Sequence, residues 1–419
     1  LQRARAEADA RARRSADTSS DAELARALQE QFAAEEALAA ERARKGKGPA
    51  AAPAPSRGGA SGAGGCTCGR PVGPFEPSVV SQSGRRYHAG CFRCGGCGGV
   101  IGAGSYAQAP DTGAPWHPSC FRERFHPRCH VCGDHIPEGP DGSCRYLHHP
   151  YWEDKCCPAH ARDGTPRCSA CLRYEKRSEP HVQLPVDGRS LCMACTSESV
   201  LTDDDVRPLY DSCARFFDKL GMPLRERPPL SLVDHTVLAA AASREGDLEA
   251  GITRGLTMSQ EHYIREVVRE PGAGPLGLGF RERHVPVGAT VTGMLLLYGM
   301  PRTLCGSVLC HELTHAWFRL QGFPRLDLQS EEGTCQLMAL LWTQAEAVKM
   351  DDAETARQAA YVGDQIMNDP SEVYGDGVRH ALAVYRASGL EPLLSHLRQH
   401  GRLPPAPRES ASFSRASLY

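Results

Sequence analysis

The sequence predicts a multidomain α+β protein, in which two cysteine-rich, zinc-ribbon-like modules precede a larger domain with its own hydrophobic core. Three observations support this fold class. The chain has 419 residues, enough for about two to four domains. Fifteen of the 19 cysteines lie between Cys66 and Cys195, where bound metal would replace a hydrophobic core. From about Leu201 the composition is that of an ordinary globular domain, and this length of chain can bury a core.

Charge, apolar content and cysteine usage narrow the partners and the compartment. The formal net charge is −2, without a sustained basic block, so we expect no nucleic-acid partner. The longest apolar stretch, residues 291–300, is too short to span a bilayer, so we expect no membrane segment. The sequence shows no charged-then-apolar leader, which favours zinc in a reducing compartment over disulfides. We expect cytoplasmic residence, with additional nuclear residence left open.

The N-terminal segment contains one short helical pattern. Ser20 and Glu23 form a capping box, and a helix is expected over residues 20–38. Three of its residues share one face: Leu24, Ala27 and Leu28. Residues 1–19 are expected to be a disordered arm, and residues 39–65, rich in Gly, Ala and Pro, a flexible linker.

Residues 66–125 repeat pairs of metal ligands at short spacing. Paired ligands lie on one face of a tight turn, and two such turns complete a tetrahedral zinc site. The spacing predicts one site from Cys66, Cys68, His88 and Cys91, and a second from Cys94, Cys97, His117 and Cys120. Cysteines that are only buried or disulfide-bonded are the alternative. The pattern resembles a LIM domain, although Cys66 and Cys68 are one residue closer than LIM spacing requires.

Residues 126–200 form a second, LIM-like unit. Its two predicted sites are Cys129, Cys132, Cys157 and His160, and Cys168, Cys171, Cys192 and Cys195. His149 is an alternative ligand for the first of these sites, and Cys144 and Cys156 are expected to be spare. Acidic residues interrupt the basic residues of 172–183, which favours protein over DNA as the binding partner.

Residues 311–315 read His-Glu-Leu-Thr-His within a predicted helix. His311 and His315 lie one turn apart and can reach one zinc ion, and Glu312 is the candidate general base for peptide hydrolysis. The gluzincin peptidases, which this pattern resembles, use a later glutamate as third ligand. In several of their families this glutamate directly precedes a glycine, which favours Glu332, at the head of a helix over residues 333–342. Glu331 would then be either in a supporting position or exposed. A salt-bridged structural helix pair without metal is the alternative.

Two further segments have candidate roles near this helix. Residues 291–298 mix β-branched and apolar residues and predict a strand, which either pairs with an extended substrate or is a plain core strand. Tyr374, in the sequence Val-Tyr-Gly-Asp-Gly, is a candidate donor to the developing oxyanion, and a buried structural tyrosine is the alternative.

Taken together, these segments resemble the plant family of ubiquitin-activated LIM-domain peptidases that restrict organ size. The resemblance runs from about Cys66 to Pro404. It implies tandem LIM and LIM-like modules followed by a gluzincin-like α+β metallopeptidase domain. The borders expected for these parts are 66–125, 126–200 and 201–404, with a disordered tail over 405–419.

The resemblance also implies the activity, the partners and the cofactors. We expect a zinc endopeptidase that ubiquitin attachment activates, that cleaves growth-regulatory and ubiquitin-pathway proteins, and that limits organ growth. The implied partners are ubiquitin, bound through the 20–38 helix, ubiquitin ligases and protein substrates, and the cofactors are one catalytic and about four structural zinc ions. After the zinc modules only Lys219 and Lys349 can accept ubiquitin. A LIM-domain adaptor with a non-catalytic peptidase-like domain is the alternative.

Overall fold

A computed structural model of the chain describes residues 66–81, 84–102, 104–140, 142–245, 253–271, 278–349 and 352–406, with the backbone alone within 261–288. The described residues form two compact units. The cysteine-rich unit comprises the described residues up to Pro166 together with Arg173–Pro180, and the helix-rich unit comprises Arg167–Leu172 and the described chain from His181 onward. The predicted helix over 20–38, with Leu24, Ala27 and Leu28, lies outside the described residues. The domain borders expected from the sequence stay predictions.

The cysteine-rich unit is built from short antiparallel hairpins, each followed by a helical turn. The hairpins are β1 (Ser78–Val80) with β2 (Arg86–His88), β3 (Ala107–Gln108) with β4 (Pro115–Trp116), and β5 (Leu147–His148) with β6 (Lys155–Cys156). The helical turns are η1 (Ala89–Cys91), α2 (Pro118–Phe125) and η2 (Pro158–Ala161). Their N-cap residues are His88, His117 and Cys157, so each hairpin delivers one predicted ligand to the start of a turn that carries the next.

The segment that carries Cys168, Cys171, Cys192 and Cys195, called here the four-cysteine segment, has these cysteines in the helix-rich unit and leads directly into it. The hairpin of β7 (Val182–Gln183) and β8 (Ser190–Leu191) is followed by α3 (Met193–Ser197). The next strand, β9 (Ser199–Val200), pairs antiparallel with β13 (Met300–Pro301), immediately before helix α6. The last cysteines are therefore tied by backbone hydrogen bonds to the start of the helix that carries His311.

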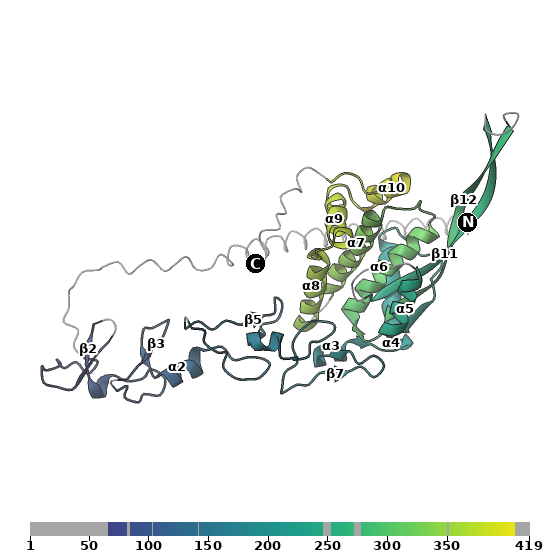
Figure 1. Cartoon of the computed structure of the whole chain (residues 1–419). Coiled ribbons are helices and arrows are strands. Elements are labelled where there is room, and N and C mark those ends of the chain that lie inside the picture. The colour runs from purple at the N-terminus through teal and green to yellow at the C-terminus, as the bar shows by residue number, and fades with distance from the viewer. Residues whose placement is uncertain are drawn as a thin grey trace, which may run out of the picture. The chain divides into compact units, whose positions relative to one another are not determined.

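A three-stranded sheet also packs against that helix. Its order is β10 (Leu230–Val233), β12 (Leu278–Leu297) and β11 (Gly255–Pro271), with β12 parallel to β10 and antiparallel to β11. The strand predicted over 291–298 is present as the end of β12, but it is the central strand, so the substrate-pairing alternative for it is wrong. Beyond the helices, β11 and β12 continue as a long hairpin (Figure 1).

Seven α-helices of the described chain complete the helix-rich unit, together with a π-helical turn, η3 (Glu372–Asp376). The helices are α4 (Asp203–Lys219), α5 (His235–Glu245), α6 (Arg302–Leu320), α7 (Leu328–Ala347), α8 (Ala353–Met367), α9 (Gly377–Ser388) and α10 (Leu390–His400). Helices α6 and α7 lie side by side (Figure 1). A Cβ atom at Gly306 of α6 would lie 2.0 Å from the ring of Trp342 of α7, so glycine permits this close approach.

The structure thus confirms a mixed protein of helices and small sheets, with cysteine-rich clusters toward its N-terminal side. Helix α7 begins at Leu328, earlier than the predicted start at residue 333, because the Asp327 side chain accepts a hydrogen bond from the backbone N–H of Ser330 and caps it. The longer helix includes Glu331 and Glu332 in its first turns. Among the described residues, no helix has the length and apolar character needed to cross a membrane.

Candidate metal centres and catalytic site

The structure brings together the four sets of cysteine and histidine residues that the spacing predicts. The sets are Cys66, Cys68, His88 and Cys91; Cys94, Cys97, His117 and Cys120; Cys129, Cys132, Cys157 and His160; and Cys168, Cys171, Cys192 and Cys195. Within each set, the ligand atoms lie within 4.8 Å of one another. The short spacing between Cys66 and Cys68 does not keep the first set apart. Each set can hold a metal ion, and thiol and imidazole donors in fours are typical of structural zinc.

In the first two sets, each histidine directs its Nδ1 atom toward the cysteines. Cys68 Sγ lies 3.4 Å from His88 Nδ1, and Cys97 Sγ lies 3.4 Å from His117 Nδ1. The other ring nitrogen is held from outside, because His88 Nε2 lies 3.0 Å from Glu76 Oε2 and His117 Nε2 lies 3.2 Å from a backbone carbonyl oxygen. Such outer contacts fix the orientation of a ligand histidine.

One thiol in each of these two sets is favoured as a thiolate. Burial disfavours charge on Cys66, but the backbone N–H groups of Cys68 and His88 outweigh it and lower the pKa of Cys66 to about 5. A similar balance of burial and backbone donors lowers the pKa of Cys94 to about 6. Because the thiolate is the form that binds metal, these backbone donors prepare both sets for an ion.

In the third set, His160 presents an unpaired nitrogen. Its Nε2 atom is buried and has no hydrogen-bond partner among the described residues, while Nδ1 lies 2.7 Å from Asp163 Oδ2. An imidazole held in this way offers Nε2 to a metal ion. The alternative ligand His149 does not join the set, and its Nδ1 accepts a hydrogen bond of 3.2 Å from a backbone N–H. Cys144 and Cys156 belong to no metal-binding set of the described chain.

Helices α6 and α7 bring His311, His315 and Glu332 together. The Nε2 atoms of the two histidines lie 3.2 Å apart. Glu332 Oε2 lies 3.1 Å from His311 Nε2 and 3.4 Å from His315 Nε2. Ligand atoms at zinc–nitrogen and zinc–oxygen bond lengths, placed at tetrahedral angles, are about 3.3 Å apart. The three separations therefore match one face of a tetrahedral zinc site.

The environment of Glu332 also fits a metal ligand. Its Oε2 atom is buried, and among the described residues no group donates a well-aligned hydrogen bond to it. Burial alone would raise the pKa of the Glu332 carboxyl, but the two neighbouring histidines outweigh burial and lower it. A buried, ionised oxygen without a donor requires another positive partner, and a metal ion between the two imidazoles would supply one.

Glu331 contacts the ring nitrogen of His315 that faces away from Glu332 Oε2. Its Oε1 atom is 2.9 Å from His315 Nδ1 and 2.8 Å from Arg319 Nη2. A carboxylate that holds the far nitrogen of an imidazole orients the ring and raises its basicity as a ligand. This geometry favours the supporting position over the exposed one for Glu331, with Glu332 as the ligand.

Cys335 is a neighbour of the site that the sequence reasoning missed. It lies one turn after Glu331 and Glu332 on α7, and its Sγ atom and the two histidine nitrogens lie within 4.8 Å of one another. Burial raises the pKa of this thiol to about 12. The helical spacing of Cys335 from the two glutamates is the signal that could have identified it.

Glu312 is held beside the two histidines by the first residues of β11. Its Oε2 atom accepts a hydrogen bond of 2.7 Å from the Thr257 hydroxyl, and the carboxylate is buried. A Cβ atom at Gly255 would lie 2.6 Å from Glu312 Oε1, so a glycine is needed for this close contact. Thr257 and Glu312 are 55 residues apart in the sequence, and no local motif predicts their contact.

Tyr374 lies on η3, near the same histidines. The centroid of its ring is 6.3 Å from that of His311, and the side chain is half-buried. The Ser371 hydroxyl accepts hydrogen bonds from the backbone N–H groups of Tyr374 and Gly375, which fixes the turn. The phenol is thus close to the candidate zinc ligands, and its role as an oxyanion donor stays a prediction.

Comparisons with known proteins identify relatives of the chain. A family model described as DA1-like, Protein DA1, matches residues 219–362 and 353–400, which include α6 and α7. Protein DA1 of Arabidopsis thaliana is 35% identical over 343 residues, covering 76% of this chain and 64% of that protein. LIM domain-containing protein HDR3 of Oryza sativa subsp. japonica is 32% identical over 394 residues, covering 80% of this chain and 78% of that protein.

A third relative extends the comparison. Protein DA1-related 2 of Arabidopsis thaliana is 32% identical over 372 residues, covering 81% of this chain and 69% of that protein. The match spans 64% of the length of both Protein DA1 and Protein DA1-related 1. The relatives and the family model confirm the resemblance drawn from the sequence, and the chain belongs to the DA1-like family.

Proposed function

We propose that the chain is a zinc-dependent peptidase whose catalytic site is formed by His311, Glu312, His315 and Glu332. The observation that carries this proposal is the convergence of two imidazole nitrogens and one carboxylate oxygen at separations of 3.1 to 3.4 Å, with Glu312 alongside. Membership in the DA1-like family, which suggests a peptidase-like domain, supports it. Three protein ligands and a neighbouring base are typical of catalytic zinc sites.

Each residue has a distinct task in this proposal. His311, His315 and Glu332 would hold a zinc ion, which when bound would polarise a peptide carbonyl and make water more acidic. Glu312 accepts a proton from the attacking water and passes it to the leaving amine. The Thr257 hydroxyl donates to one oxygen of Glu312 and so restrains the orientation of the carboxylate. Tyr374 donates to the oxygen on which negative charge develops.

The substrate would bind as an extended strand beside β11. In the described part of the sheet this strand pairs only with β12, so its other edge has no strand partner. Its first residues, Gly255 and Thr257, contact Glu312. A peptide added to this edge would have its backbone next to the catalytic base. In this proposal the substrate pairs with the free edge of β11 and not with residues 291–298.

The test compares ubiquitylated wild type with ubiquitylated Glu312→Gln in cleavage of a purified ubiquitin-pathway protein. Glu312→Gln should lower the cleavage rate by roughly 10²-fold or more, because it removes the base, and should keep the bound zinc. Glu391→Gln, an equivalent change at an exposed position of α10, should cleave at the wild-type rate. Equal cleavage by the Glu312→Gln and wild-type proteins would exclude Glu312 as the base.

We further propose that ubiquitin attachment activates the peptidase. Lys219 and Lys349, the two lysines after the zinc modules, are both exposed and open to conjugation. The partners would be ubiquitin, ubiquitin ligases and growth-regulatory or ubiquitin-pathway proteins, in the cytoplasm and, as a second location, the nucleus. Replacing both lysines by Arg should abolish activation by a ubiquitylation mixture. Activation that persists in this double variant would place the modification elsewhere.

A LIM-domain adaptor is the second candidate function. It is favoured by the four cysteine and histidine sets and by the rice relative, which is described as a LIM domain-containing protein. The adaptor predicts that ubiquitylated protein carrying its full zinc content cleaves no substrate. The same cleavage assay therefore distinguishes the two functions.

A further inference from the structure

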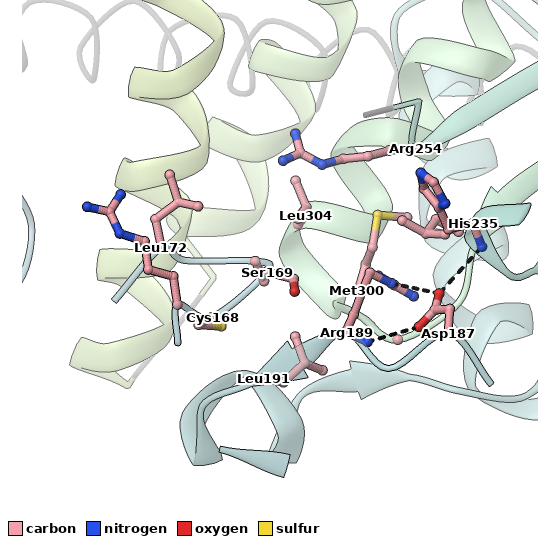
Figure 2. Close-up of a pocket in the computed structure, with 14 residues that line it drawn as sticks. Cys168, Ser169, Leu172, Asp187, Arg189, Leu191, His235, Arg254, Met300 and Leu304 are labelled. Atoms are coloured by element: carbon pink, nitrogen blue, oxygen red, sulfur yellow. Dashed lines mark hydrogen bonds and ion pairs between the residues drawn. The ribbon is translucent and has the colours of Figure 1, made fainter. Parts of the chain in front are cut away.

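A cavity of about 320 Å³ lies within the helix-rich unit, between the four-cysteine segment and the start of α6 (Figure 2). Its volume is at the lower end of the range of ligand pockets in proteins. It contains none of the candidate catalytic residues. Much of its wall is apolar, formed by the side chains of Leu172, Leu191, Leu297, Met300 and Leu304.

The charged side chains of the wall are predominantly basic. They are Arg167, Arg189, Arg254 and Asp187, with His235 beside them. Asp187 is already engaged, because its Oδ2 atom lies 2.8 Å from Arg189 Nε and its Oδ1 atom lies 3.4 Å from the Tyr298 hydroxyl. The single acidic side chain of the wall therefore neutralises one of its three arginines.

Arg254 has no carboxylate partner among the described residues. Figure 2 shows its side chain extending across the cavity above Leu304, with the guanidinium pointing away from Asp187. Among the described residues, no acidic side chain forms an ion pair or hydrogen bond with it. Arg254 is half-buried, and burial lowers its pKa, an effect that Tyr361 opposes and Arg189 reinforces. The guanidinium nevertheless stays protonated. An unpaired, partly buried charge costs free energy that a bound anion would offset.

We propose that this cavity binds a carboxylate carried by an apolar peptide segment, and that Arg254 holds the carboxylate. A guanidinium pairs with a carboxylate through two parallel hydrogen bonds. The leucine and methionine side chains of the wall would contact aliphatic side chains next to the acidic residue. A small inorganic anion would use the arginine and leave this apolar wall in water.

The site adjoins the candidate catalytic base through β11. Arg254 directly precedes Gly255, which packs against Glu312, and Thr257, which donates to Glu312. A peptide held by Arg254 would therefore restrain the strand that orients the base. Binding itself does not depend on the proposed peptidase activity, so it is measured on the zinc-loaded full chain without any substrate turnover.

The experiment is calorimetric titration with three probes: acetyl-Leu-Asp-Leu-amide, its uncharged analogue acetyl-Leu-Asn-Leu-amide, and inorganic phosphate. The aspartate peptide should bind at least about tenfold more tightly than the asparagine peptide. Arg254→Gln should weaken the aspartate peptide by about tenfold or more, and Arg254→Lys by less, since it keeps the charge and loses the planar fork. Arg207→Gln, the same charge change on an exposed residue of α4, should leave the affinity unchanged.

A second pair of variants tests the site if Arg254→Gln does not fold. Leu172 lines the cavity, is 42% exposed and has a φ of 62°, a conformation that Asp and Asn adopt more readily than Leu. Leu172→Asp places a carboxylate on the wall and should weaken binding of the aspartate peptide several-fold more than Leu172→Asn does. Equal binding of the two peptides, equal affinity in the two Leu172 variants, or binding of phosphate alone would overturn the proposal.

Discussion

The cysteine-rich unit and the helix-rich unit place similar ligand atoms in opposite settings. In the cysteine-rich unit the buried clusters are small; one consists of Phe92, Cys94 and Ile101, with partly buried neighbours. In the helix-rich unit a large hydrophobic core extends from β9 and α4 to the segment after α10, and α6 and α7 run through it. The first unit has too little apolar burial to fold without metal, whereas the second has enough to present donors in a fixed geometry.

The number of ligand atoms that the protein supplies also differs between the structural sites and the site between α6 and α7. The predicted structural sites offer four cysteine or histidine atoms each, which would close the coordination of a zinc ion. The site between α6 and α7 offers His311, His315 and Glu332 at tetrahedral separations, with the base Glu312 beside them. In the cysteine-rich unit the ions would hold the fold, and between α6 and α7 the fold would hold the ion. The four-cysteine set is a site of the first kind, although its cysteines belong to the helix-rich unit. The predictions that follow test this contrast.

Removal of zinc should have the largest effect, and it should act on the structural cysteine and histidine sets rather than on α6 and α7. A strong chelator at neutral pH should unfold the cysteine-rich unit, because metal replaces its core, and leave α6 and α7 folded. Hydrogen exchange should then show loss of amide protection over residues 84–140, with protection kept over Arg302–Leu320 and Leu328–Ala347. Loss of protection over residues 84–140 and over α6 and α7 at the same chelator concentration would contradict the separate roles of the metal.

Replacing the third ligand should remove one zinc ion without unfolding the helix-rich unit. Glu332→Gln should bind one zinc fewer than wild type and lose cleavage activity by roughly 10²-fold or more, because a neutral amide is a poor zinc ligand. Cys335→Ala, one turn along α7, should keep the full zinc content. Metal counting by mass spectrometry checks both. The opposite outcome, in which Cys335→Ala loses the ion and Glu332→Gln keeps it, would make the thiol the ligand.

The packing of α7 against α9 should tolerate no added methyl group. A Cβ atom at Gly333 would lie 2.4 Å from the backbone of Gly377, so Gly333→Ala should destabilise the helix-rich unit by about 1–3 kcal/mol. Gly363→Ala is the matched control on α8, because its Cβ would meet Leu340 at an ordinary 3.5 Å. It should be neutral or stabilising by up to about 1 kcal/mol. Denaturant unfolding of zinc-loaded protein measures both, and equal effects would show that the two helices do not pack this closely.

The ion pair between Asp187 and Arg189 should give a smaller, pH-dependent effect. Burial raises the pKa of Asp187, but Arg189 outweighs burial and lowers it below its ordinary value. The folded state therefore binds this proton more weakly than the unfolded state does. The stabilisation is present above the unfolded pKa of about 3.9 and is lost as the pH falls through the lower folded pKa. Asp187→Asn should cost about 1–3 kcal/mol at pH 7.

Thermal unfolding of wild type and Asp187→Asn between pH 7 and pH 3 measures this effect. The difference between the two proteins should be constant down to about pH 5 and should then narrow, because protonated wild-type Asp187 resembles the amide. Asp204→Asn removes an exposed ion pair with Arg207 and should change stability little at any pH. A difference that widens in acid would reverse the sign of the Asp187 contribution.

Much of the candidate site could be predicted from the spacing of residues that are close in the sequence. Ligands two or three residues apart occupy one turn, so the cysteine and histidine sets could be assigned before their relative positions were known. The same holds for His311 and His315, one turn apart on a helix, whereas Glu332 was assigned from the resemblance to gluzincin peptidases. The family resemblance could be drawn from the same stretches. The segment carrying Leu24, Ala27 and Leu28 lies outside the described residues, and ubiquitin binding there stays a prediction.

Contacts between segments that are far apart in the chain could not be predicted from the sequence. Thr257 could not be linked to Glu312, since 55 residues separate them and hydroxyl residues are common in strands. The strand at 291–298 was identified, but its central place in the sheet depends on partners at both edges, one of them parallel. Arg254 had no motif at all, because its significance lies in the absence of an acidic neighbour among the described residues around the cavity.

By itself, then, the sequence determined which residues can bind metal and which helix bears the candidate base, because ligand spacing and helical periodicity are properties of a few neighbouring residues. Only the tertiary structure decided that Glu332 faces both histidines while Glu331 faces Arg319, that β11 orients Glu312, and that Arg254 lines a cavity. Each of these depends on how α6, α7 and the sheet pack, and packing is set by contacts far apart in the chain.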